Sequence, residues 1–151
     1  MLKNIDPLLS PDLLKLLCEM GHGDEIVLAD ANFTAHSLSQ GRPVLRLPGI
    51  GMARASEAVL SVLPLDAAVP QPVAYMQVSD TPPGYRSELQ REVMAQMQAR
   101  GEAQPAQCEA VERFAFYERV GRACAIVQTG EMQPFANFIF KKGVLAQALR
   151  P

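Results

Sequence analysis

The stretch EIVLAD, residues 25–30, decides the fold, because four consecutive apolar residues lie between an acidic residue on each side. An apolar run this short that contains Ile and Val is typical of a buried strand, whereas a buried helix needs about ten residues or more. We therefore expect residues 25–30 to form a strand.

A helix is expected directly before this strand. Residues 10–12, SPD, supply a capping serine, a proline suited to the first turn and an acidic residue near the positive end of the helix dipole. We expect Gly21 to end this helix. Its predicted buried face consists of Leu13, Leu14, Leu17 and Cys18.

Further strands and helices alternate along the chain. The patterns predict strands at residues 44–47, 73–78, 124–129 and 137–141, and helices at residues 51–63, 86–100 and 113–122. Such alternation indicates a layered α/β domain with a mixed or mostly parallel sheet. A length of 151 residues suits one domain, so we expect residues 1–151 to form a single domain.

The composition argues against several kinds of partner. The formal net charge is −2, so no basic surplus exists to neutralise phosphates, and we expect no nucleic-acid partner. No apolar run approaches the roughly 18 residues of a membrane span, so we expect no membrane partner. The three cysteines form no C-x-x-C pair, which fits reduced thiols in a cytoplasmic protein.

Only two histidines are present, His22 and His36, so proton transfer near neutral pH has few possible carriers. His22 lies between two glycines, where a permissive backbone can bring the ring close to a ligand. An exposed loop residue after a helix cap is the alternative interpretation. His36 falls in a predicted loop, where a lone histidine is more often structural.

Two polar residues flank predicted strands. Asp30 ends the first strand, and ligands of open α/β sheets collect at the carboxyl ends of strands. Its carboxylate can accept hydrogen bonds from sugar or alcohol hydroxyls, although a turn or capping residue is an equal alternative. Asn137 offers both a donor and an acceptor, which suits recognition of a diol, or it is a turn residue.

Motifs for metals, phosphates and serine nucleophiles are missing. Cys18, the two histidines and the neighbouring acidic residues match no ligand spacing, so we predict no metal. The segment PGIGM, residues 48–52, lacks the third glycine of a dinucleotide fingerprint, and no G-K-[ST] is present. Neither Ser56 nor Ser61 lies in a nucleophile elbow.

Four segments are most informative when they are taken together. They are EMGHGDEI (19–26), DANFTAHS (30–37), RFAFYER (113–119), and Asn137 with KKGV (141–144). In this order, and over nearly the whole chain, they resemble the L-fucose mutarotase and D-ribose pyranase family (RbsD/FucU). The fucose branch is more similar, because the RFAFYER segment begins with an arginine where the ribose branch tends to have a histidine.

The resemblance implies a cofactor-free isomerase that interconverts the anomers of a free monosaccharide, L-fucose or a related sugar. A D-ribose pyranase activity and a non-catalytic sugar-binding role remain the alternatives. The implied fold is a three-layer α/β domain with a mixed, mostly parallel sheet. The implied assembly is a cyclic homo-oligomer, a pentamer or a decamer.

The resemblance also assigns roles to single residues. His22 corresponds to the catalytic acid–base residue. The implied sugar-binding residues are Asp30, Arg113, Phe135, Ala136 and Asn137. Phe135 departs from the pattern, because the family usually has a tyrosine there; a phenyl ring can stack on a sugar but cannot form a hydrogen bond through a hydroxyl. Whether His36 or Tyr117 takes part is left open.

The predicted strand separates two of these residues. If residues 25–29 are extended, they span roughly 16 Å at about 3.3 Å per residue, which places His22 and Asp30 near opposite ends. Both can contact one small sugar only if the glycine loop folds back or if neighbouring subunits share the site. We expect the second arrangement, with sites near subunit interfaces.

Overall fold

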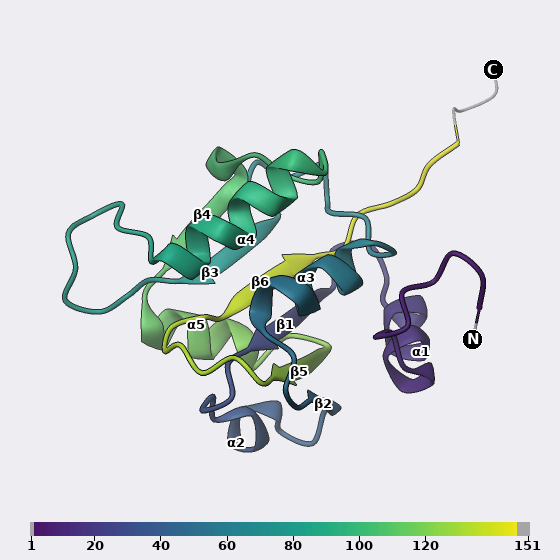
Figure 1. The fold of residues 1–151 in the computed structure, drawn as a ribbon, viewed down its shortest axis with the longest axis horizontal. Coiled ribbons are helices and arrows are strands. Elements are labelled where there is room, and N and C mark those ends of the chain that lie inside the picture. Colours follow the sequence, from purple (N-terminus) through teal and green to yellow (C-terminus); the bar gives the residue numbers. More distant parts are fainter. Residues whose placement is uncertain (1, 148–151) are drawn as a thin grey trace.

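The computed structural model describes residues 2–147; residue 1 and residues 148–151 of the expected domain 1–151 lie outside the described residues. One six-stranded sheet has the order β2-β5-β1-β6-β3-β4 (Figure 1). The strands are β1 (Glu25–Ala29), β2 (Val44–Leu47), β3 (Val73–Met76), β4 (Cys108–Val111), β5 (Ala125–Thr129) and β6 (Phe138–Lys141). Strand β6 runs antiparallel to β1 and β3, and the other three pairings are parallel, which confirms the mixed, mostly parallel sheet.

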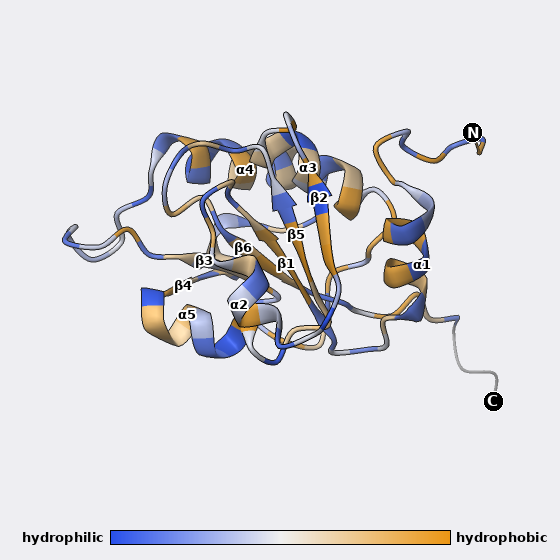
Figure 2. Cartoon of the chain, turned by 90° about the horizontal axis from the view of Figure 1, so that it is seen from below, coloured by the Kyte–Doolittle hydropathy of each residue, from blue (hydrophilic) through white to orange (hydrophobic). Residues whose placement is uncertain are grey.

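Helices cover both faces of this sheet. They are α1 (Pro11–Glu19), α2 (Ala35–Ser39), α3 (Met52–Leu60), α4 (Glu88–Ala99) and α5 (Arg113–Val120), with a 3-10 turn at Pro105–Gln107. Helices α3 and α4 lie on one face, α2 and α5 lie on the other, and α1 stands beside the sheet (Figure 2). The expected three-layer α/β arrangement is therefore confirmed.

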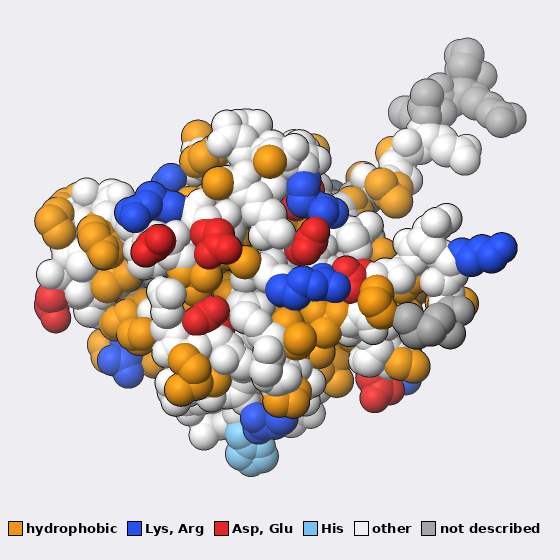
Figure 3. All heavy atoms as spheres, viewed as in Figure 1, with side chains coloured by type: hydrophobic (Ala, Val, Ile, Leu, Met, Phe, Trp, Pro, Cys, Tyr) orange, Lys and Arg blue, Asp and Glu red, His pale blue; other side chains and the backbone are white. Residues whose placement is uncertain are grey.

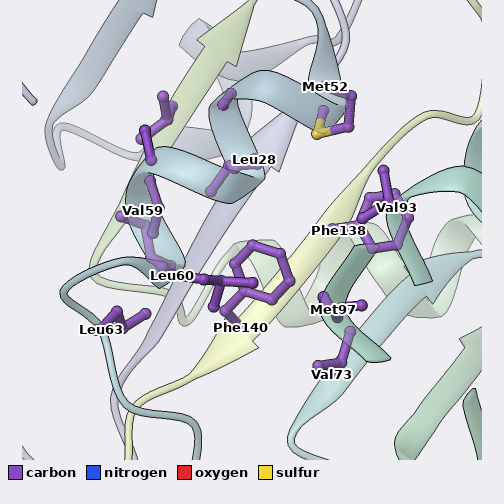
Figure 4. Packing of buried hydrophobic residues seen from close by; sticks show 14 of the residues in the cluster. Leu28, Met52, Val59, Leu60, Leu63, Val73, Val93, Met97, Phe138 and Phe140 are labelled. Carbon is purple, nitrogen blue, oxygen red and sulfur yellow. The ribbon is translucent and has the colours of Figure 1, made fainter. Parts of the chain in front are cut away.

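The burial of β1 explains why its sequence is apolar without alternation. Ile26 and Leu28 pack in the core beneath α1, α3 and α4, and Val27 and Ala29 pack against α2 and α5. All four side chains are fully buried, because the strand lies in the interior of a sheet that is covered on both faces. Figure 4 shows how Leu28 and its neighbours pack on the first of these faces.

One detail predicted for α1 is wrong. Its buried face consists of Leu13, Leu16 and Leu17, and Cys18 is exposed, because residue 18 lies about 140° around the helix from Leu13, at the centre of that face. The end of the helix is as predicted: Glu19 is its last residue, Met20 is the C-cap with extended backbone angles, and Gly21 follows the cap directly.

Two short elements were not predicted. Strand β4 is an edge strand that pairs only with β3, so it needs no continuous apolar run, and it carries Glu109 and the exposed Ala110. Helix α2 has five residues and no side-chain hydrogen bond at its N-cap, so it has almost no sequence signal. Both occur where the chain was expected to be irregular.

The distribution of surface charge and the lengths of the helices indicate which kinds of partner the protein can bind. Acidic and basic side chains are interspersed on the face shown in Figure 3, with no field of one sign. Within residues 2–147, no helix is long and apolar enough to cross a membrane.

The packing of the core predicts that two phenylalanines contribute very differently to the free energy of unfolding. Phe140 of β6 is fully buried and stacks on Phe138, so Phe140→Ala should lower the free energy of unfolding by about 3–5 kcal/mol. Phe114 is 67% exposed, so the matched variant Phe114→Ala should stay within about 0.5 kcal/mol of wild type. Denaturant unfolding measures both; equal losses would contradict this core.

Candidate functional site

Asp30 and Asn137 form a reciprocal pair at one end of the sheet. Asp30 follows β1 and Asn137 precedes β6, and the two strands are antiparallel neighbours, so the residues lie side by side. The backbone N–H of Asp30 donates to Asn137 Oδ1 at 2.8 Å, and Asn137 Nδ2 donates to Asp30 Oδ2 at 2.9 Å. Both residues are buried, so each orients the other.

The Asp30 carboxylate is held in an environment that disfavours its charge. Burial raises the pKa of Asp30, while the hydrogen bonds from Asn137 and from the backbone N–H of Asn32, at 3.0 Å, partly oppose this rise. Asn137 Nδ2 has one further neighbour, the Met76 sulfur at 3.7 Å, which is a weak acceptor. One N–H of Asn137 is thus available to a better acceptor.

The pair lies at a cavity of about 250 Å³. The cavity is lined by Asp30, Asn32, Phe33, Met76, Arg113, Tyr117, Pro134, Phe135 and Asn137. The structure thereby brings together four of the residues predicted from the sequence and adds Tyr117, whose participation was left open. Carboxylate, guanidinium, amide and aromatic groups around one small cavity can bind a polyhydroxylated ligand.

Arg113 reaches the cavity from the first turn of α5. The Glu112 side chain caps this helix by accepting hydrogen bonds from the backbone N–H groups of Phe114, at 2.8 Å, and Ala115, at 3.2 Å. Arg113 Nε donates to the hydroxyl of Tyr117, one turn later, at 3.0 Å, and its guanidinium lies 5.4 Å from the centre of that ring. Tyr117 in turn packs edge-on against Phe33, so the arginine has a fixed support.

Phe135 reaches the cavity through an unusual backbone conformation. Its φ is +61°, a left-handed value that costs a non-glycine residue about 1–3 kcal/mol. Gln90 of α4 holds it there: its buried Nε2 donates to the carbonyls of Phe135, at 3.1 Å, and of Met76, at 2.8 Å. Ala136 follows with its side chain packed in the main core, not in the cavity. Gln90 was missed because its partners lie far away in the sequence.

His22 lies in a different place. It borders a mostly apolar groove of about 550 Å³ between α1, the segment before it and residues 142–145. The imidazole is half-exposed, and its Nε2 is 3.1 Å from Oδ1 of Asp66. This groove and the Asp30 cavity have no lining residue in common, so one chain does not bring His22 and Asp30 together. His36 is exposed on α2 and lines neither of them.

A cluster of charged side chains joins the C-terminal end of α5 to strands β1 and β4. Arg119 pairs with Glu25 at 2.7 Å and with Glu109 at 3.0 Å, and Lys141 also pairs with Glu25, at 3.3 Å. Burial opposes ionisation of Glu25, yet the hydrogen bonds from Arg119 hold the pKa of Glu25 below its usual value. These opposite charges satisfy one another, which gives the cluster a structural role.

Metal binding has no support in this arrangement. In the part of the chain that the structure describes, no three His, Cys, Asp or Glu side chains gather as metal ligands would. Cys108 is buried, and burial raises the pKa of its thiol to about 11, so it is protonated at neutral pH.

The environment of Asp30 predicts an unusual pH dependence of stability. Its pKa is raised by folding, so its ionisation destabilises the native state as the pH rises above the ordinary value of 3.8. In Asp30→Asn this penalty is absent, so the variant's free energy of unfolding should increase relative to wild type between about pH 4 and pH 7. Denaturant unfolding at several pH values measures the difference.

Asp6 provides a control of opposite sign. Arg54 Nη2 donates to Asp6 Oδ1 at 2.6 Å, which lowers the pKa of Asp6. The loss of stability in Asp6→Asn relative to wild type should therefore grow as the pH rises from acidic values to about pH 5, and it should stay constant above that pH. A loss of stability in Asp30→Asn that grows with pH, as in Asp6→Asn, would contradict the assignment of Asp30 as a strained carboxylate.

Comparisons with known proteins show what this chain is similar to over nearly its whole length. Residues 3–145 match the RbsD / FucU transport protein family. The fucose mutarotase of Homo sapiens is 45% identical over 148 residues, which cover 96% of this chain and 95% of that protein. The L-fucose mutarotase of Actinobacillus pleuropneumoniae is 44% identical over 144 residues, covering 95% of this chain and 97% of that protein.

A solved structure extends the likeness to three dimensions. The crystal structure of the fucose mutarotase from Streptococcus pneumoniae in complex with L-fucose superposes with a TM-score of 0.85. The two sequences are 39% identical, and the match covers 96% of this chain and 100% of the other. On sequence and fold together, this chain belongs to the RbsD/FucU family.

Proposed function

We propose that this protein is a mutarotase that interconverts the α and β anomers of L-fucose or a closely related free monosaccharide. The observation that supports this most directly is the Asp30–Asn137 pair at a small cavity beside Arg113. Relatives of 44–45% identity are named fucose mutarotases, and a relative of this fold has been solved with L-fucose.

The proposed reaction transfers protons and breaks and re-forms one C–O bond. His22 takes the proton of the anomeric hydroxyl, the electron pair forms the C1 carbonyl, and the bond between C1 and the ring oxygen breaks. The ring oxygen then receives the proton from the imidazolium, directly or through water. Rotation about the bond to C1 and the reverse transfers close the ring on the other face. No electron is gained or lost, so the reaction requires no redox cofactor.

The proposed roles follow from the chemistry of each side chain. Imidazole, with an ordinary pKa near 6.5, both accepts and donates protons at neutral pH. Asp30 accepts hydrogen bonds from sugar hydroxyls, while Arg113 and the available N–H of Asn137 donate to others. The Phe135 ring stacks on the apolar face of the sugar. Ala136 lies between Phe135 and Asn137 in the sequence, and we assign it the role of spacing these two residues.

We infer that two subunits share each site. The four extended residues of β6 alone span roughly 13 Å, and they separate the His22 groove from the Asp30 cavity. The cavity volume of about 250 Å³ is below the usual 300–1,000 Å³ of ligand sites, as expected for an incomplete one. The apolar groove around His22 gives a second copy a surface to cover. We expect the assembly to be a cyclic pentamer or decamer.

We expect the cytoplasm as the compartment. Cys18, Cys108 and Cys124 are all free thiols, which suits a reducing environment.

Exchange NMR tests the reaction. Saturation transfer between the anomers of L-fucose should show acceleration by the wild type, and His22→Ala should reduce it by about 10²–10⁴-fold, the contribution of a positioned acid–base group. His36→Ala is the matched control and should exchange sugar at the wild-type rate. The same rates for wild type and His22→Ala would contradict the role of His22.

The choice of sugar separates the alternatives. If D-ribose pyranose and furanose forms exchange faster than the anomers of L-fucose or D-galactose, a pyranase activity replaces the proposal. If His22→Ala still binds sugar and the wild type accelerates no exchange, the protein is a non-catalytic sugar-binding protein. Phe135, which lacks the tyrosine hydroxyl, is the feature that favours this second alternative.

Sharing of the site predicts that activity depends on assembly. As the protein is diluted, the rate of exchange per chain should fall together with the molar mass that light scattering measures. A monomer that keeps the full rate per chain would contradict the shared site.

A further inference from the structure

Gln90 is a fully buried amide, and three backbone groups surround it. Its Nε2 donates to the carbonyls of Met76, at 2.8 Å, and Phe135, at 3.1 Å. Its Oε1 accepts the backbone N–H of Ser87 at 3.0 Å. The two carbonyls require donors and the N–H requires an acceptor, so the orientation of the amide is fixed by its partners.

The three partners belong to three separate segments. Ser87 is the N-cap of α4, and its hydroxyl accepts the backbone N–H of Gln90 at 3.2 Å, which completes a capping box. Met76 is the last residue of β3, and Phe135 lies in the segment before β6. Met76 and Phe135 line the Asp30 cavity, but Gln90 does not. Gln90 can therefore act on the cavity only through the backbone of residues that line it.

Met76 extends the contact of Gln90 to Asn137. The backbone N–H of Met76 donates to the carbonyl of Asn137 at 3.0 Å, while the carbonyl of Met76 accepts from Gln90. Residues 135–137 are thus held at their first residue by Gln90 and at their last by Met76. Both ends of this short segment are fastened to the same buried amide.

The backbone of Phe135 needs such a hold. Its φ of +61° is a value that glycine adopts freely and a residue with a side chain does not. The three residues before it are exposed. Among the described residues, Gln90 is the only side chain that hydrogen-bonds the backbone of Phe135. If φ returned to the ordinary negative region, the phenyl ring would leave its present direction.

We propose that Gln90 is a positioning residue that sets the affinity for the sugar: it holds Phe135 in the left-handed conformation and so keeps the phenyl ring against the apolar face of the ligand. This inference rests on the proposed function and names a residue outside the cavity that determines binding. Stacking contributes equally to the bound sugar and to the transition state, so its loss weakens binding without slowing proton transfer.

The variant Gln90→Glu tests this role. Glutamate keeps the size of the side chain and an oxygen that accepts the Ser87 N–H, so the start of α4 is preserved, but it replaces the nitrogen that donates to both carbonyls. We expect KM for L-fucose to rise about 3–10-fold, the contribution of one aromatic contact, with kcat unchanged. Saturation-transfer NMR over a series of L-fucose concentrations measures both constants.

Two further variants accompany this measurement. Gln98→Glu makes the same change at an exposed position of the same helix, so it is the matched control and should keep the wild-type KM. Gln90→Met has a side chain of similar length that cannot donate a hydrogen bond, and it should raise KM as Gln90→Glu does. A merely structural role would lower the free energy of unfolding and leave the KM of the folded protein unchanged, which would overturn the proposal.

A double-mutant cycle shows whether Gln90 acts through the ring. Phe135→Ala removes the ring, so adding Gln90→Glu to Phe135→Ala should raise KM no further. Increases in KM that multiply in the double variant would overturn the proposal, because Gln90 would then affect binding by another route.

Two outcomes separate this inference from the proposed function. If the wild type accelerates anomer exchange and both Gln90 variants keep its KM, the positioning role is wrong and the mutarotase proposal stands. If the wild type binds L-fucose but accelerates no exchange, the mutarotase proposal is wrong. In that case a Kd for L-fucose that rises in Gln90→Glu and not in Gln98→Glu still supports the role of Gln90, and an unchanged Kd overturns it.

Discussion

The antiparallel pairing of β6 with β1 is the constraint on which the rest of the structure depends. At one end of this pair Asn137 orients Asp30 through two hydrogen bonds. At the other end the backbone of Lys142 hydrogen-bonds Gly23 and Asp24, in the loop that carries His22. The two proposed halves of the site are therefore fixed to the same rigid pair of strands. That rigidity makes each half well defined and also keeps the two apart within one chain.

The half of the site around Asp30 contains two groups that are less stable where they are than they would be elsewhere. Asp30 is a carboxylate whose pKa is raised by burial, and Phe135 has a left-handed backbone. Asn137 and the buried Gln90 hold these groups in place through hydrogen bonds. Such compensated strain is typical of functional sites, because binding groups must remain partly unsatisfied until the ligand arrives.

Much of this was predictable from local sequence. The apolar run of β1 predicted a buried strand, and the length of that strand predicted that His22 and Asp30 lie near its opposite ends. Cys18 was misplaced because helical periodicity leaves the direction of the buried face uncertain by one residue, and tertiary packing decides it. Asp66 was missed for another reason: its partner lies 44 residues away, and no motif marks a carboxylate whose role depends on that contact.

Mixing two inactive variants tests the shared site most directly. His22→Ala keeps an intact Asp30 cavity, and Asp30→Ala keeps an intact His22 groove. If each site takes His22 from one subunit and Asp30 from another, then unfolding and refolding the two variants together should restore anomer exchange of L-fucose in the mixed oligomers. Mixed oligomers that stay as inactive as each variant alone would contradict a site shared between subunits.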